Sequence, residues 1–441
     1  MKRIFTGLLF LIMFRAAYAD GDQDPLKHIP LNSSGSIWTS FGGQFRERDE
    51  SWNHFQFGAS GPHGVYTENL LLTRILLYQD LHLGNNVRIF LEGKGDYISN
   101  RLLTGGIRTQ DADDSDLEAA FFDLKFPISK SGHIGFQAGR QEFAFGNQRL
   151  IGTSDWSNSR RSFDGVDNLI TLGNWTITTF SMRPVLIRLH SFDVSDPTSL
   201  LTGSYAAGFL PALKSSVDLY WIRVDHTQIT WDGIAGPEER DTFGLRFQHQ
   251  ISENALDYEL ETATQSGSLG ANSIHGFMFT GGAGYTLREW KAAPRFYTQY
   301  DYASGSQKYG QDIGTFDTLY PSRHSAFGFM DQVGRANLID LRFGASVAAA
   351  KNLSVSLERH AYWRASTGDA LYDSNGNIFR SAAAGTAADI GSEWDLRARY
   401  NLDRHTMLET GIGHFSAGTF IKQSGPSSDI NFVYASTQYT F

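Results

Sequence analysis

The chain of 441 residues contains no cysteine, which excludes disulfide bonds, thiolate nucleophiles and thiolate metal ligands. It also lacks a basic excess. Its 38 lysines and arginines stand against 47 aspartates and glutamates, and the formal net charge of −9 argues against a nucleic-acid-binding protein. After residue 19 no apolar run reaches the roughly 20 residues of a transmembrane helix. The mean hydropathy of −0.30 is nevertheless compatible with a membrane β-barrel, because lumen residues dilute the lipid face.

The N-terminus has the pattern of a secretory signal peptide. Lys2 and Arg3 precede an apolar run over residues 4–14, and a small-x-small triplet follows at 17–19. The run is too short for a membrane anchor, so we expect residues 1–19 to be a cleaved signal peptide. Residues 20–35 are polar, contain Pro25 and Pro30, and are expected to form a short periplasmic lead-in.

The C-terminal stretch 431–441, NFVYASTQYTF, alternates between two faces. Val433 and Ala435 fall on one side of an extended chain, and Tyr434 and Ser436 fall on the other. A chain that ends on an aromatic residue after such a strand is typical of the closing strand of a bacterial outer-membrane barrel. We expect this strand to pair with the first one, because closure removes both free edges of the sheet.

The same alternation recurs along the whole chain and is clearest over 87–97, where Ile89 and Leu91 oppose Arg88 and Glu92. Short turns alternate with long polar loops, which favours a membrane barrel over a soluble sandwich. We predict an all-β fold: a single transmembrane antiparallel β-barrel over residues 36–441, with about 18 strands, short periplasmic turns and long extracellular loops. The expected strands are 37–49, 69–83, 87–97, 116–126, 133–143, 163–171, 174–184, 204–211, 215–225, 239–251, 255–266, 274–287, 293–303, 337–349, 353–366, 391–401, 405–417 and 431–441. Long loops are expected between alternate strands, among them one near 226–238 and a shorter one near 267–273.

Charged residues of both signs fall on the faces expected to line the lumen. An arginine ladder there would bind carboxylates or phosphates in transit, because the guanidinium fork matches a planar anion. The alternative is that these charges pair across strands and only hold a hydrated wall together. The candidate lumen residues are Arg46, Arg48, Arg74, Arg88, Glu92, Arg295, Arg342, Arg364 and Arg397.

Two stretches that contain long loops indicate a particular family more specifically than the alternation of apolar and polar residues does. One is GRQEFAFGNQRLIGTSDWSNSRRSFDG over 139–165, and the other includes TFDTLYPSRH over 315–324. They resemble the alginate export family of Gram-negative outer-membrane proteins, whose members look like GRQEL-x-YG-x-QRL-x-G followed by W-x-N and R-x-FDG. The matching residues are Gly139, Arg140, Gln141, Glu142, Gly146, Gln148, Arg149, Leu150, Gly152, Trp156, Asn158, Arg161, Phe163, Asp164 and Gly165.

The resemblance implies an 18-stranded barrel with an arginine-rich constriction that conducts a polyuronate. The best constriction candidates are Arg140, Arg149 and Arg161, with Glu142 and Asp164. The alternative for this group is an ion-paired loop that braces the mouth. The residues expected to line the lumen carry charges of both signs, whereas a channel dedicated to a polyanion would be expected to have a mainly positive lumen.

The sequence contains no complete catalytic or calcium-binding motif. Ser322, His324 and Asp331 lie close in sequence without a nucleophile elbow, and Asp111, Asp113, Ser115 and Glu118 lack full calcium-loop spacing. We therefore predict a non-enzymatic, monomeric channel without a cofactor in the outer membrane of a Gram-negative bacterium. It would conduct an anionic polysaccharide or oligosaccharide, and would contact lipid, lipopolysaccharide and periplasmic secretion proteins. The alternatives are an uptake porin for small anions or sugars on the same barrel, and a barrel enzyme acting on lipid or peptide.

Overall fold

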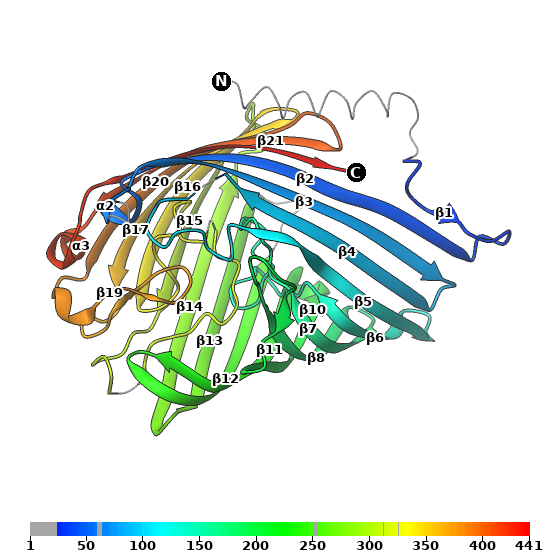
Figure 1. The fold of residues 1–441 in the computed structure, drawn as a ribbon, viewed down its shortest axis with the longest axis horizontal. Coiled ribbons are helices and arrows are strands. Elements are labelled where there is room, and N and C mark those ends of the chain that lie inside the picture. Colours follow the sequence, from blue (N-terminus) through cyan, green and yellow to red (C-terminus); the bar gives the residue numbers. More distant parts are fainter. Residues whose placement is uncertain (1–23, 60–63, 100, 250–254, 312, 325) are drawn as a thin grey trace.

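The computed structural model describes residues 24–59, 64–99, 101–249, 255–311, 313–324 and 326–441. The predicted signal peptide at 1–19 lies outside this part of the chain. Among the described residues, eighteen antiparallel strands form one closed barrel (Figure 1). They are β2 (Ile37–Asn53), β3 (Glu68–Leu83), β4 (Val87–Ile98), β5 (Asp113–Ser129), β6 (Gly132–Gln141), β7 (Phe163–Leu172), β8 (Trp175–Leu186), β10 (Ser199–Leu210), β11 (Ser215–Trp231), β12 (Ile234–His249), β13 (Leu256–Leu269), β14 (Asn272–Thr286), β15 (Arg295–Ala303), β16 (Leu338–Ala350), β17 (Leu353–Arg364), β20 (Asp389–Asn401), β21 (Thr406–Ala417) and β22 (Ile430–Thr440).

The barrel closes where the sequence predicts. β22 pairs antiparallel with β2, in a register that runs from Gln44 opposite Thr440 to Asn53 opposite Asn431. Val433 faces outward with 44% of its surface exposed, whereas Tyr434 is buried inside. All eighteen strands lie within a few residues of their predicted positions, because each keeps the period-two alternation of a wall with lipid on one side.

The lead-in covers the end of β2 that projects beyond β22. β1 (Ile29–Pro30) pairs with Trp38 and Thr39 of β2, on the edge that β22 leaves free. The Lys27 ammonium donates hydrogen bonds to the main-chain oxygens of Phe41 at 2.8 Å and Phe441 at 3.2 Å. This short segment therefore protects a strand edge and links the two ends of the barrel sheet.

Two of the predicted loops, the long one near 226–238 and the shorter one near 267–273, are wrong. β11 and β12 continue to a two-residue turn at Asp232-Gly233, and β13 and β14 meet at a turn of residues 270–271. Asp232 and Gly233 have φ values of 52° and 75°, as a tight type I′ hairpin turn requires. The polar residues near 226–238 suggested a loop, but they belong to strands whose inner face, with Trp231, Ile234 and Glu238, is buried against inward-folded loops.

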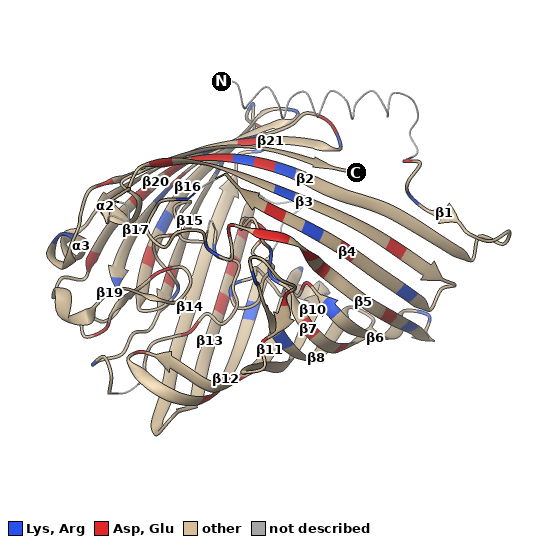
Figure 2. Cartoon of the chain, viewed as in Figure 1, with Lys and Arg blue, Asp and Glu red and all other residues tan. Residues whose placement is uncertain are grey.

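The two faces of the wall differ in the way that a membrane barrel demands. Leu77, Leu91 and Phe243 are 45–58% exposed on the outside, where they meet lipid. Charged residues occupy inward positions, and Figure 2 shows bands of both signs side by side along β2, β3 and β4. The structure therefore has the apolar exterior and polar interior that the sequence predicts.

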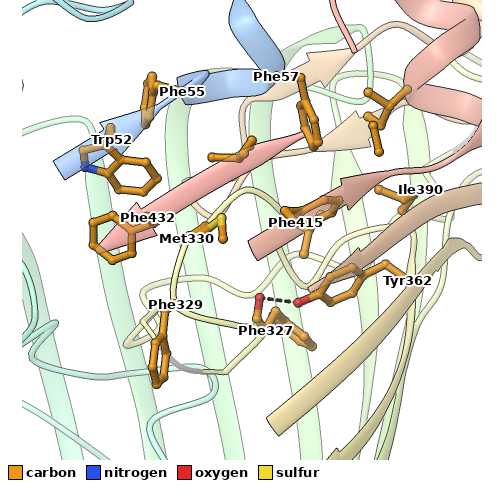
Figure 3. Packing of buried hydrophobic residues seen from close by; sticks show 14 of the residues in the cluster. Trp52, Phe55, Phe57, Phe327, Phe329, Met330, Tyr362, Ile390, Phe415 and Phe432 are labelled. Atoms are coloured by element: carbon orange, nitrogen blue, oxygen red, sulfur yellow. Dashed lines mark hydrogen bonds between the residues drawn. The ribbon is translucent and has the colours of Figure 1, made fainter. Parts of the chain in front are cut away.

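The long loops gather at one end of the barrel, with the short helices α2 (Phe55–Gly58) and α3 (Thr419–Ser424), and several fold into the lumen (Figure 1). A buried aromatic cluster joins β2, β20, β21 and β22 to residues 327–333 of the 304–337 loop (Figure 3). Within this cluster the Tyr362 hydroxyl donates to the carbonyl of Phe327 at 2.8 Å. A second cluster holds residues 143–151 against β7 to β14. Both clusters fill parts of the lumen, so the open path is narrower than the barrel.

Candidate channel constriction

The motif loop over residues 142–162 lies inside the barrel. Phe145 stacks on Tyr205 of β10 with ring centroids 4.3 Å apart, and Phe143 and Ile151 are buried in the same cluster. The loop also joins the 304–337 loop, since Gly152 N–H donates to the Tyr320 carbonyl at 2.8 Å. The two sequence motifs singled out from the chain are therefore packed against each other in the lumen.

Three predicted lumen arginines hold this loop by its backbone. Arg46 donates to the carbonyls of Asp155 at 2.7 Å and Ser157 at 2.9 Å. Arg48 donates to the Trp156 carbonyl at 2.5 Å. Arg74 reaches the carbonyls of Asp155 at 2.9 Å and Ser157 at 3.2 Å. We refer to Arg46, Arg48 and Arg74 as the arginine clamp.

A carboxylate of the loop adds an ion pair to the clamp. Asp155 Oδ1 lies 2.8 Å from Arg74 Nη2 and 3.3 Å from Arg160 Nε. The reduced access of bulk water inside the barrel would by itself raise the pKa of Asp155, but the guanidiniums of Arg74, Arg160 and Arg46 outweigh this effect and lower the pKa to about 2. Arg160 also lies 2.6 Å from Glu142, so it links both ends of the loop.

The Trp156 indole forms a stack at the tip of the loop. The Arg48 guanidinium carbon lies 3.8 Å from its ring centroid, and the His324 ring lies 3.7 Å away at an interplanar angle of 6°. Asp331 contacts the edge of the His324 ring, with Nδ1 and Oδ2 3.3 Å apart. This stack joins the barrel wall, the 142–162 loop and the 304–337 loop.

Two cavities meet beside this stack. The larger, of about 850 Å³, runs along β12 to β16 and ends at the 304–337 loop. The smaller, of about 260 Å³, lies among the long loops above the arginine clamp. Arg323, His324 and Ser374 line both cavities, and we call these three residues the neck.

Arg323 is the cation of the neck. Its Nη1 donates to Gln110 Oε1 at 3.2 Å, and its Nε is buried without a hydrogen-bond partner in the described part of the chain. Burial lowers the pKa of Arg323, which the nearby carboxylates Asp373 and Asp331 partly oppose. Among the described residues no carboxylate lies within ion-pair distance of Arg323, so its charge remains available to an anion at the boundary that the two cavities share.

Four predicted arginines line a cavity, and each has a carboxylate partner. In the larger cavity Arg149 lies 2.6 Å from both Glu259 and Glu261. In the same cavity Arg295 lies 2.6 Å from Asp257, and Arg342 lies 3.3 Å from Glu358. Arg48 lines the smaller cavity and pairs with Glu50 at 2.7 Å. Pairing across the wall, which the sequence left as the alternative, thus coexists with exposure to the path.

The remaining predicted residues line neither cavity. Arg88 pairs with Asp80 at 2.8 Å near the short-turn end. Arg140 pairs with Asp164 at 2.8 Å. Arg364 is enclosed by main-chain carbonyls, including that of Ala387 at 2.6 Å. Glu92 is buried beside Arg160 and Glu118, and Glu142 pairs with Arg160. Arg161 donates to the carbonyls of Gly152 and Pro321. Arg397 lies over the Phe329 ring.

The sequence analysis missed several residues of the path. Arg323 and Arg335 line the larger cavity, and Arg160 anchors the motif loop. All three lie in loops, where the period-two alternation that identified the wall arginines does not apply. The only signal was their position within or beside the two motifs.

The comparisons agree with this architecture. None of the described helices is long and apolar enough to cross a membrane. No curated protein matches the chain. Similar solved structures include three Pseudomonas aeruginosa proteins, each matching 91% of this chain. OccK9 (OpdG) has a TM-score of 0.63 and 13% sequence identity, with 98% of its chain covered. OccK2 (OpdF) in complex with glucuronate has a TM-score of 0.58 and 11% identity, with 96% covered. OpdK with vanillate has a TM-score of 0.58 and 10% identity, with 98% covered.

At these identities the structural likeness shows the fold alone. The sequence pattern of the alginate export family, in contrast, matches residues 37–435, which is nearly the whole barrel. The match includes both motif loops and reaches into the closing strand β22. The chain therefore belongs to the alginate export family and is an outer-membrane β-barrel channel, not an enzyme.

Proposed function

We propose that this channel conducts anionic saccharides of the uronate type by passive diffusion. The observation that carries the proposal is Arg323, which lines both cavities at the neck and has no carboxylate within ion-pair distance among the described residues. A planar carboxylate matches the donor geometry of such a group. A saccharide carboxylate would therefore be attracted at the boundary between the two cavities.

The wall below the neck suits transit rather than tight binding. Arg149, Arg295 and Arg342 line the larger cavity, and each is already paired with a carboxylate. A paired arginine attracts an anion less than a free one, so a solute that passes the neck can leave again. Tyr297 and Tyr258 add aromatic surface, against which the apolar faces of sugar rings can pack.

The second candidate, an uptake porin for small anions, rests on the size of the path. The larger cavity of about 850 Å³ is within the range of small-ligand sites, and the inward loops separate it from the smaller cavity at the neck. Among the similar structures, one is a complex with glucuronate and another contains vanillate, both small carboxylates. This supports a carboxylate specificity for both candidates and leaves polymer length as the difference between them.

Planar-bilayer recording with the full-length channel tests the proposal. We expect anion selectivity, and block by a polyuronate but not by neutral dextran. Arg323→Gln should lower the selectivity about fivefold, since one charge about 4 Å from the path contributes about 1 kcal/mol in water-like surroundings. Arg88→Gln is the matched control, because Arg88 is paired with Asp80 away from the neck.

The outcomes separate the two candidates. Block by a uronate monomer without block by the polymer would favour the uptake porin. Equal permeability to cations, with no effect of Arg323→Gln, would refute the carboxylate specificity of both.

The proposed function also implies an environment and partners. The protein itself would be exported by a signal peptide at residues 1–19. It would then reside as a monomeric barrel among lipid and lipopolysaccharide in the outer membrane. If the solute is a polymer, a periplasmic synthase or scaffold must deliver it to the short-turn end. Crosslinking at residues 24–35 of the lead-in, followed by mass spectrometry, would test for such a protein.

A further inference from the structure

Two buried carboxyl groups face each other where the β11–β12 turn meets two long loops. Asp232 of the turn is only 1% exposed, and Asp369 of the 365–388 loop is fully buried. The hydroxyl of Thr315, on the 304–337 loop, lies 2.6 Å from Asp369 Oδ2 and 3.1 Å from Asp232 Oδ2. Three elements that are far apart in the sequence therefore meet at one oxygen atom. We call Asp232 and Asp369 the acid pair.

Asp369 is surrounded by hydrogen-bond donors. Its carboxylate accepts the main-chain N–H groups of Ala370 at 2.6 Å and Ser306 at 3.0 Å. It is also the nearer acceptor for two hydroxyls, those of Thr315 at 2.6 Å and Tyr372 at 3.0 Å. Hydrogen bonds to the charged form of a carboxyl group favour that form. Asp369 is therefore the member of the pair that carries the negative charge.

Asp232 has fewer donors of its own. The Ser306 hydroxyl donates to its carboxyl group. The hydroxyls of Thr315 and Tyr372 lie 3.1 Å and 3.4 Å from Asp232, farther than from Asp369. Each hydroxyl has one proton, so it serves one carboxylate at a time. A proton on Asp232 itself would supply the missing donor.

No cation balances a second negative charge at the acid pair. In the described part of the chain, no lysine, arginine or histidine lies within ion-pair distance of either carboxylate. Arg364 acts on Asp369 electrostatically, but its Nη1 donates to the main-chain oxygen of that residue, at 2.9 Å. The other titratable groups at the pair are the phenols of Tyr309 and Tyr372, whose pKa values burial and the two carboxylates raise. Burial and the charge of Asp369 raise the pKa of Asp232 to about 7, so the pair keeps one proton below that pH.

The acid pair joins the two loops that carry the neck. Tyr372 stacks on Trp231 of β11 with ring centroids 5.2 Å apart, and its carbonyl accepts the N–H of Gly334 at 3.0 Å. Ser374, two residues after Tyr372, belongs to the neck, as does Arg323 of the 304–337 loop. Separation of the two loops would therefore change the width of the path at the neck.

We propose that the acid pair is a proton-operated latch, which holds the two neck loops on the β11–β12 turn while one proton is shared and releases them when that proton is lost. Loss of the proton leaves two buried negative charges in competition for the same hydroxyls, which is costly until water enters. Release of loops that fold into the lumen widens the path. The latch acts in the same way whichever solute the channel carries.

The direction of the pH effect follows from the raised pKa. Because an aspartate in a released loop has a pKa of about 3.9, the latch contributes fully below about pH 4 and fails as the pH rises through about 7. Between pH 5 and pH 8 the ratio of latched to released loops should fall about 100-fold. The open time of a larger conductance state should rise over the same range.

Single-channel recording of the full-length channel in KCl at pH 5 and pH 8 tests the proposal. We expect the wild-type channel to spend more time in a larger conductance state at pH 8. Asp232→Asn cannot ionise and should remain in the smaller state at both pH values. Asparagine also tolerates the left-handed φ of 52° at this turn, so the variant should fold. Asp80→Asn is the matched control, because it removes a carboxylate that pairs with Arg88 away from the latch, and it should keep the wild-type response.

His324 of the neck is the rival source of a pH response in this range. A response that persists in Asp232→Asn but disappears in His324→Gln would overturn the latch. Loss of the response in Asp232→Asn, with a response retained in His324→Gln, would support it. The wild-type channel alone also decides the matter: the same conductance and gating at pH 5 and pH 8 would overturn the proposal without reliance on any variant.

Discussion

Replacing Arg74 with Met should release the 142–162 loop from the barrel wall and raise the conductance of the channel. Arg74 is fully buried and makes five hydrogen bonds, of which three reach Asp155 or Ser157 on the loop and two reach Gln44. Met keeps most of the volume and removes every donor. The change therefore tests the hydrogen bonds of the arginine clamp rather than its packing.

The expected loss follows from what remains around the site. Removing one partner of a buried ion pair costs about 3–5 kcal/mol. Here the Asp155 side chain is 56% exposed, so water can solvate it, and Arg46 still donates to the same two carbonyls. We therefore expect the lower end, about 3 kcal/mol, which reduces the ratio of docked to undocked loop about 100-fold.

Single-channel recording measures this release directly. The Arg74→Met channel should show larger conductance or frequent transitions to a larger state, because the undocked loop no longer narrows the lumen. Arg88→Met is the matched control: Arg88 also pairs with a carboxylate on the inner wall, Asp80, but makes no contact with the loop. If the Arg74→Met and wild-type channels have the same conductance and the same gating, the clamp does not hold the loop.

Three further predictions follow from the loops and strands. Trp156→Ala removes the ring between Arg48 and His324, so conductance in bilayers should rise while anion selectivity is retained. Gly139→Ala should lower the folded yield on heat-modifiability gels, because at φ 131° a Cβ would lie 2.2 Å from a carbonyl of β5. Burial and the neighbouring Asp369 raise the pKa of Asp232 to about 7, so its contribution to stability is complete below pH 4 and is lost as the pH rises through 7. Hydrogen exchange of the 365–388 loop, corrected for its intrinsic pH dependence, should therefore be slower at pH 5 than at pH 8, and Asp232→Asn should remove the difference.

The strands were predictable because a membrane wall imposes one rule on each of them. Lipid on one side and water on the other produce an alternation of apolar and polar residues that is visible within a single strand of about ten residues. The aromatic Phe441 at the end of the chain identified the closing strand. The rule is harder to apply where the inner face of a strand packs against inward-folded loops, because polar residues such as Asp232 and Glu238 are then buried there. The β11–β12 hairpin is such a case, although its Asp232-Gly233 turn signal stands in the sequence.

Alternation placed the wall arginines inside the barrel but did not reveal what each one contacts. Arg46 and Arg295 have the same pattern in sequence, yet one holds a loop and the other lines the larger cavity. The difference lies in which loops fold inward, and that depends on contacts between residues more than 100 positions apart. Arg323, from a loop with no periodicity, was not predictable as a site residue.

The way in which the arginines are held decides the charge near the neck. Arg149 and Arg295 pair with carboxylates, so their charges largely cancel. Arg46 and Arg161 donate mainly to backbone carbonyls, which satisfy the guanidinium without neutralising it. Burial and nearby Arg323 lower the pKa of Arg161 to about 9, which leaves it charged at neutral pH. Main-chain anchoring thus lets Arg46 and Arg161 keep their charge in a chain of net charge −9, whereas the arginines of the smaller cavity, Arg48, Arg101, Arg108 and Arg323, face the carboxylates Glu50, Asp111, Asp331 and Asp373.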